Sequence, residues 1–255
     1  LYLDITNASI NKYDTGSNDR INAILSDFSQ LGFSQERIYL MGVFANMNSA
    51  TESIRALKLI EAFMIRQRFT GSITGKALNT LYADICSQAF DRDNAIAYIR
   101  SQLADTAPDD ETVKASLITH NFSRSDRTLF FLKRLESEYY RSGGAVPSLR
   151  GEIEHIAPRK AFTAVKYNTW PTYLGVGREE FNQFKDRLGN LTILENRLNL
   201  EASDNPFDQK KTKYMGSEFE MAKSISDYEE WSIEMIENRS EELANAATEI
   251  WDFNV

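Results

Sequence analysis

The chain has 255 residues, of which 42% are hydrophobic and 26% charged, and its formal net charge is −8. These values are ordinary for a soluble globular protein with one large or two modest domains. No apolar run reaches the length of a membrane helix, and the single cysteine excludes an internal disulfide. We therefore expect a cytoplasmic protein without a membrane partner. Because the first residue is Leu1, we also expect a further N-terminal domain ahead of this chain.

The acidity is concentrated near the C-terminal end. Residues 1–150 carry 17 basic and 17 acidic residues, residues 151–215 carry 10 and 9, and residues 216–255 carry 2 and 11. The middle segment therefore has a net charge of +1 and can present a local basic face, whereas the last segment is strongly acidic.

Residues 1–145 are predicted to form a helical domain, because apolar residues recur there with helical spacing. Asn18 and Ser49 are predicted N-caps, and Gly32 and Gly71 are predicted C-caps. A loop is expected over residues 1–16, and helices over 18–31, 36–45, 50–70, 74–90, 93–104, 110–118 and 125–141. Glycines and a proline then interrupt the pattern, so we place the domain boundary at residues 142–150.

Residues 146–255 are predicted to form a second domain that mixes strands with helices. Short strands are expected at residues 152–156 and 191–194, with a helix at 179–187 between them. The intervening aromatic residues 161–176 are expected to form an irregular loop. Asn205 is a predicted N-cap before Pro206, and Ser226 with Glu229 forms a predicted capping box for the last helix.

Glu154 and His155 are adjacent at the end of the first predicted strand, and Asn199 lies beyond the second. Histidine is well suited to take a proton from water near neutral pH. Mg²⁺ takes few protein ligands and prefers oxygen, so Glu154 and the Asn199 carbonyl would supply a sparse metal site. A metal ion also stabilises the leaving oxygen of a phosphodiester. These residues therefore predict a metal-dependent phosphodiesterase.

The same residues resemble the HNH group of the His-Me finger, or ββα-metal, nucleases. Glu154-His155 matches the acidic residue–histidine pair of that group, Asn190 its middle asparagine, and Asn199 its third position. The resemblance implies that His155 is the general base and that Glu154 and Asn199 hold Mg²⁺ or Mn²⁺. It implies that Asn190 braces the finger and orients the histidine. The implied fold is mainly α, with a helical domain followed by an α+β domain containing a ββα-metal finger.

A wider resemblance links the chain to the C-terminal nuclease domain of GmrSD-type restriction enzymes. The stretches E-H-I-A-P, L-G-N-L-T-I-L and N-P-F-D-Q-K carry it. It implies a DNA endonuclease of an anti-phage restriction system, cutting one or both strands of foreign, often modified, DNA. Phosphorothioate-sensing members of the SspE type nick DNA. The resemblance also implies a missing N-terminal domain that hydrolyses or senses nucleotides.

Basic residues beside these motifs are candidate contacts to DNA phosphates. They are Arg159, Lys160, Lys210 and Lys211. The alternative for the lysines is a solvated helix face. Asn190 and Asn199 have an alternative as turn residues, with Asn196 as a substitute for Asn199. For the whole chain, the alternative function is a helical protein- or DNA-binding adaptor that carries a degenerate, non-catalytic HNH fold.

Overall fold

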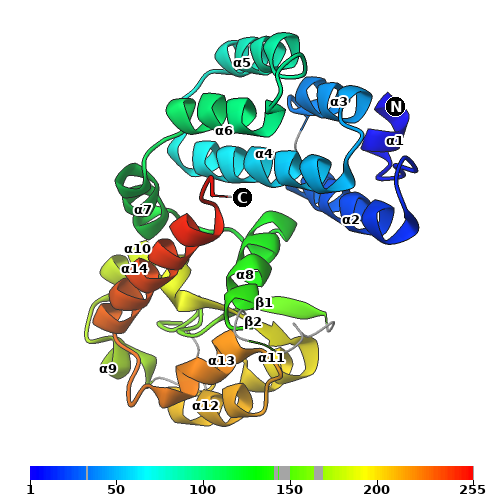
Figure 1. Ribbon diagram of the computed structural model, residues 1–255. Helices are drawn as coiled ribbons and strands as arrows, with labels where there is room; N and C mark the ends of the chain where they lie inside the picture. Colours follow the sequence, from blue (N-terminus) through cyan, green and yellow to red (C-terminus); the bar gives the residue numbers. More distant parts are fainter. Residues whose placement is uncertain (33, 141–142, 144–149, 164–168, 255) are drawn as a thin grey trace. The chain divides into compact units, whose positions relative to one another are not determined.

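The computed structural model describes residues 1–32, 34–140, 143, 150–163 and 169–254 (Figure 1). This part of the chain is mainly helical, as predicted, with one small antiparallel sheet of two strands. It divides into two compact units, one made of Leu1–Val113 with Trp251–Val255 and the other of Lys114–Ile250. The predicted boundary at 142–150 lies largely outside the described residues. None of the described helices is long and apolar enough to cross a membrane.

The first unit contains helices throughout its described residues. They are α1 (Tyr2–Thr6), α2 (Thr15–Leu31), α3 (Arg37–Asn46), α4 (Ala50–Thr70), α5 (Gly75–Gln88), α6 (Ala95–Thr106) and the start of α7 (Asp110–Thr119). The apolar face of α4 supplies much of the core and packs against α2, α3 and α6. The short helix α1 lies within the residues where a loop was expected.

Three of the four helix caps predicted for this unit are confirmed. Ser49 caps α4 by accepting a hydrogen bond from the Glu52 amide at 3.3 Å. Gly32 and Gly71 end their helices with φ angles of 73° and 61°, a left-handed conformation that glycine adopts without strain. The prediction for Asn18 was wrong, because Asp14 is the N-cap of α2. The Asn18 side chain is instead buried and accepts from two backbone amides of the preceding loop.

The chain returns to the first unit at its C-terminal end. The Trp251 indole donates to Glu61 Oε1 at 3.0 Å, and Arg66 Nε donates to the Trp251 carbonyl at 2.7 Å. Arg66 also pairs with Asp110 at 2.7 Å. Because the indole and the guanidinium both find partners, these buried polar groups incur no uncompensated desolvation cost.

The second unit surrounds the sheet with helices. Its elements are α8 (Asp126–Glu138), β1 (Gly151–His155), α9 (Trp170–Leu174), α10 (Arg178–Phe184), η1 (Leu188–Asn190), β2 (Leu191–Glu195), α11 (Asn196–Ala202), α12 (Phe207–Met215), α13 (Glu220–Lys223), η2 (Ser224–Asp227) and α14 (Ile233–Ile250). Both strands lie within one residue of their predicted positions. They pair with Gly151 opposite Glu195 and His155 opposite Leu191. Helices α8 and α11 contact both strands (Figure 1).

Two predicted helix starts in this unit were wrong. The Asn205 side-chain amide donates to the Glu201 carbonyl of α11, and Pro206 is the N-cap of α12. Ser226 lies in the short helix η2, and its hydroxyl donates to the Lys223 carbonyl at the end of α13. Helix α14 therefore begins only at Ile233, beside Ser232. Within the predicted aromatic loop, Trp170 begins the short helix α9, while residues 164–168 lie outside the described residues.

Candidate active site

His155 is the last residue of β1, and its side chain is only 6% exposed. Its Nε2 atom lies 2.9 Å from Asp186 Oδ1. A carboxylate at this distance favours the tautomer with a proton on Nε2, which leaves Nδ1 as a proton acceptor. No hydrogen bond to Nδ1 is present in the part of the chain that the structure describes. Asp186 therefore orients the ring through Nε2, and Nδ1 is available to accept a proton.

Asp186 is a site residue that sequence reasoning missed. Burial raises its pKa, but the hydrogen bond with His155 and the charge of Arg159 outweigh burial and hold the pKa below its ordinary value. Asp186 therefore stays a carboxylate at neutral pH. It lies 31 residues from His155 in sequence, so no spacing rule connects them. The one local signal is its place just before the L-G-N stretch, where the chain returns to the sheet.

Asn190 lies in η1 just before β2 and is completely buried. Its Oδ1 accepts from the Ala157 amide at 2.8 Å and from the Trp231 indole at 3.2 Å. Its Nδ2 donates to the carbonyls of Ala157 and Lys185, each at 2.9 Å. All the hydrogen-bonding positions of this carboxamide are therefore used. They tie the segment that follows His155 to the segment that precedes β2.

Glu154 is buried, with its side chain 6% exposed, and both of its hydrogen bonds reach the same oxygen. Lys210 Nζ lies 2.6 Å from Glu154 Oε1, and the Tyr214 hydroxyl donates to that atom at 3.1 Å. No described residue bonds Oε2. Lys210 is 0% exposed and also donates to the backbone. The sequence indicated that Lys210 could contact a DNA phosphate. In the structure its ammonium is enclosed by protein and does not face solvent.

Asn199 lies on α11, a helix that sequence reasoning did not predict. Its Nδ2 donates to Glu152 Oε2 at 3.1 Å, and Asn196 Nδ2 donates to Glu152 Oε1 at 2.6 Å. Asn199 thus contacts Glu152, which shares a face of β1 with Glu154 because side chains alternate along a strand. Within the described residues, Asn199 Oδ1 makes no hydrogen bond. Both asparagines therefore orient the same glutamate.

The oxygens of Glu154 and Asn199 are suitable donors for a hard divalent cation. One carboxylate oxygen and one carboxamide oxygen would be a sparse set, of the kind that Mg²⁺ completes with water. Lys210 and Tyr214 would orient the carboxylate, as neighbouring groups commonly do for metal ligands. Over the described ranges, no three His, Cys, Asp or Glu side chains gather into a metal-binding group. The oxygens of Glu154 and Asn199 therefore fit Mg²⁺ or Mn²⁺ if water supplies most of the other ligands of the ion.

The other three basic candidates differ in exposure. Arg159 is 52% exposed and pairs with Asp186 at 3.2 Å, and Lys160 beside it is also exposed. Lys211 is half-buried and donates to the Tyr228 carbonyl at 2.6 Å. Arg159 and Lys160 therefore lie on the surface, a few residues after His155 in the chain.

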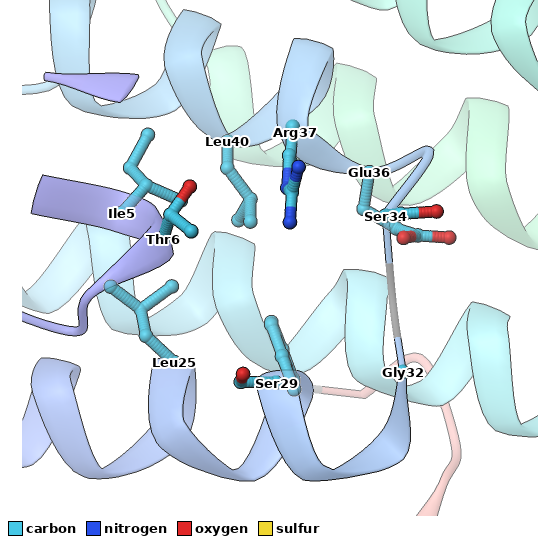
Figure 2. A pocket seen from close by; sticks show the side chains of 10 residues that line it. Ile5, Thr6, Leu25, Ser29, Gly32, Ser34, Glu36, Arg37 and Leu40 are labelled. Carbon is cyan, nitrogen blue, oxygen red and sulfur yellow. The ribbon is translucent and has the colours of Figure 1, made fainter. Parts of the chain in front are cut away.

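A cavity of about 280 Å³ lies in the first unit and contains none of these residues (Figure 2). Its walls come from α1, α2, α3 and the connection between α2 and α3. Among the side chains shown are Ile5, Leu25, Glu36 and Leu40. The candidate active site and this cavity are thus separate features of the chain.

A comparison with protein families identifies the class of protein to which this chain belongs. Residues 107–246 match the family described as GmrSD restriction endonucleases, C-terminal domain. The match covers more than half of the chain, so the chain belongs to this family. The predicted resemblance is confirmed, and the family suggests a restriction endonuclease with DNA as its substrate. Comparison with curated proteins found no match.

Proposed function

We propose that this chain is a metal-dependent DNA endonuclease of the HNH type and that His155 activates the attacking water. The family supports the endonuclease activity. The observation that carries the chemistry is the state of His155, with Nε2 held by Asp186 and no described partner at Nδ1. A buried imidazole oriented in this way is what a general base requires. In this proposal β1, β2 and α11 form the ββα finger.

The chain's own groups then have distinct tasks. His155 Nδ1 takes a proton from the water as it attacks phosphorus, and the Asp186 carboxylate stabilises the resulting imidazolium. Asn190 keeps the backbone after His155 in place through its four hydrogen bonds. Glu154 Oε2 and Asn199 Oδ1 would hold Mg²⁺ or Mn²⁺. When bound, the metal ion would neutralise phosphate charge and stabilise the leaving oxygen.

The surface around the site would contact DNA through backbone phosphates. Arg159 and Lys160 are exposed cations that follow His155 by four and five residues, and Lys211 is a further candidate. Phosphate contacts position a duplex without reading its sequence. Recognition of foreign, phage or phosphorothioate-modified DNA would therefore depend on other parts of the protein. We propose that these include a preceding domain that senses or hydrolyses nucleotides, in a cytoplasmic anti-phage system.

The test is a plasmid assay that separates nicked from linear product, with Mg²⁺, with Mn²⁺ and with EDTA. We expect cleavage only with metal, and a loss of at least about 100-fold in His155→Ala, as for removal of a general base. His120→Ala is the matched control, because His120 is the only other histidine and is exposed. Circular dichroism establishes that each variant is folded. Unchanged cleavage by folded His155→Ala would overturn the proposal.

The same experiment addresses the adaptor alternative. A folded wild-type protein that binds DNA but cleaves it with neither metal would favour a degenerate, non-catalytic fold. Product topology distinguishes a nickase, which yields open circles, from an enzyme that cuts both strands and yields linear plasmid.

A further inference from the structure

We propose that Lys210 is a positioning residue of this site, whose buried ammonium fixes both the Glu154 carboxylate and the backbone that follows His155. The inference rests on the proposed nuclease function and assigns a role to a residue that touches neither DNA nor metal. Lys210 reaches the end of β1 from α12, across 56 residues of sequence to Glu154. It would act by presenting Glu154 Oε2 toward the metal.

The burial of Lys210 is the first step of the argument. A lysine at 0% exposure loses its hydration, which is costly unless all three N–H donors find acceptors. They do so: Glu154 Oε1 lies at 2.6 Å, the His155 carbonyl at 2.8 Å and the Ile156 carbonyl at 3.1 Å. The Nζ atom also lies over the Trp170 ring, 5.8 Å from its centroid. The ammonium therefore has one well-defined position.

The backbone around His155 is the second step. Lys210 binds the carbonyls of His155 and Ile156, while Asn190 binds the Ile156 amide through its backbone and both polar groups of Ala157 through its side chain. Every backbone donor and acceptor from the His155 carbonyl to the Ala157 carbonyl thus has a partner. Lys210 and Asn190 together hold the backbone at the end of β1. They thereby fix the position from which the His155 side chain projects.

The asymmetry of Glu154 is the third step. Lys210 and Tyr214 both bind Oε1, and no described residue binds Oε2. Tyr214 is 0% exposed and projects from α12 one helical turn after Lys210. One helix therefore supplies both contacts, and together they hold Oε1 in place. Loss of either contact would let the carboxylate rotate and weaken its use as a metal ligand.

The experiment compares Lys210→Met with Lys223→Met, which makes the same chemical change at a surface ion pair with Glu220. Mn²⁺ binding is measured directly by electron paramagnetic resonance of the free ion, and nicking is measured against Mn²⁺ concentration. We expect folded Lys210→Met to bind Mn²⁺ about 10–100-fold more weakly, as is typical when a group that orients a metal ligand is lost. Lys223→Met should match the wild type. Wild-type Mn²⁺ binding and nicking by folded Lys210→Met would overturn the inference.

A salt titration separates positioning from phosphate contact. Removing a lysine that touches phosphate reduces the slope of log affinity for DNA against log salt by about 0.9. For Lys210→Met we expect an unchanged slope, and a slope reduced by that amount would overturn the inference.

Tyr214→Phe covers the case in which Lys210→Met does not fold, because it removes one hydrogen bond and no charge. We expect several-fold weaker Mn²⁺ binding, and wild-type affinity in this variant would overturn the inference. A wild-type protein that neither binds Mn²⁺ nor nicks plasmid would instead overturn the proposed function, and the inference with it. The two failures are thereby distinguishable.

Discussion

The two units of the molecule differ in the hydrogen bonding of some of their buried polar side chains. In the first unit, Glu36 Oε2, Gln67 Nε2 and the Tyr82 hydroxyl are buried without hydrogen-bond partners among the described residues. All three side chains line one cavity of about 280 Å³. In the second unit, the buried side chains of His155, Asn190 and Lys210 are all hydrogen-bonded. Thr192 Oγ1 and Arg239 Nη2 are the unpartnered atoms described there, and neither belongs to the proposed site.

This difference indicates what holds each unit in shape. Apolar packing around α4 specifies the first unit, and a cavity of this size can admit water to the three unpartnered atoms. In the second unit a connected hydrogen-bond network specifies where β1 and β2 end. Such networks stabilise one geometry when every member is satisfied and are costly when one is removed. Substitutions in the hydrogen-bonded network of the second unit should therefore have larger effects than substitutions at the three unpartnered polar side chains of the first unit.

The largest effect is expected for Asn190→Ala. It leaves the Ala157 amide, two carbonyls and the Trp231 indole without partners, so we expect a loss of about 3–4 kcal/mol in the free energy of unfolding. Urea unfolding measures it. Asn196→Ala is the control, because Asn196 is exposed and its side chain makes one hydrogen bond, to Glu152. Equal stability of the two variants would show that the network does not hold the unit together.

Asp186→Asn should have the next largest effect. Asparagine retains an acceptor but not the charge that stabilises protonated His155, so we expect nicking to fall about 10–100-fold. The measurement is the nicking rate at saturating metal. A loss seen only as weaker metal binding would contradict the role of Asp186 at the histidine.

The same variant has a defined pH dependence of stability. The folded protein lowers the pKa of Asp186, so its carboxylate stabilises the fold above the ordinary pKa. That contribution is lost as the pH falls through the lowered value. The stability difference between wild type and Asp186→Asn should therefore be present at neutral pH and shrink below about pH 4. A difference that grows on acidification would contradict this sign.

Sequence reasoning succeeded where the determining interactions are local. The two strands, the Ser49 cap and the left-handed glycines follow from alternation and capping, which involve neighbouring residues. The motif residues Glu154 and Asn190 were found because their types and order resemble the HNH motif. The family match confirms the resemblance, whereas the assigned roles of these residues stay predictions.

The rest depends on contacts between distant residues. Asp186 and Lys210 meet the end of β1 across 31 and 56 residues, and only the folded chain brings them together. From sequence alone, a lysine between polar neighbours on α12 indicates a solvated face or a phosphate contact. Asn18 shows the same limit at short range: Asp14 and Asn18 are both good caps, and the fold uses Asp14 as the cap.

A smaller effect is expected at the surface. Lys160→Ala should leave stability and the nicking rate at saturating DNA nearly unchanged. It should reduce the slope of log affinity against log salt by about 0.9 if Lys160 contacts one phosphate. Arg197→Ala is the control, because Arg197 is exposed and pairs with Glu201 on its own helix. Identical slopes for both variants would remove Lys160 from the DNA-binding surface.

The smallest effect is expected for Tyr82→Phe, and Tyr214→Phe is its matched comparison. Both tyrosines are 0% exposed, and burial raises both pKa values, so each is a neutral hydroxyl at any working pH. The Tyr214 hydroxyl donates to Glu154, and its loss should cost about 1–2 kcal/mol. The Tyr82 hydroxyl lines a cavity without a described partner, so Tyr82→Phe should change stability by less than about 0.5 kcal/mol. Urea unfolding with hydrogen exchange assigns each change to its unit. An equal cost for both variants would mean that water satisfies Tyr82 as firmly as Glu154 satisfies Tyr214, and the two units would then differ only in what supplies the hydrogen bond.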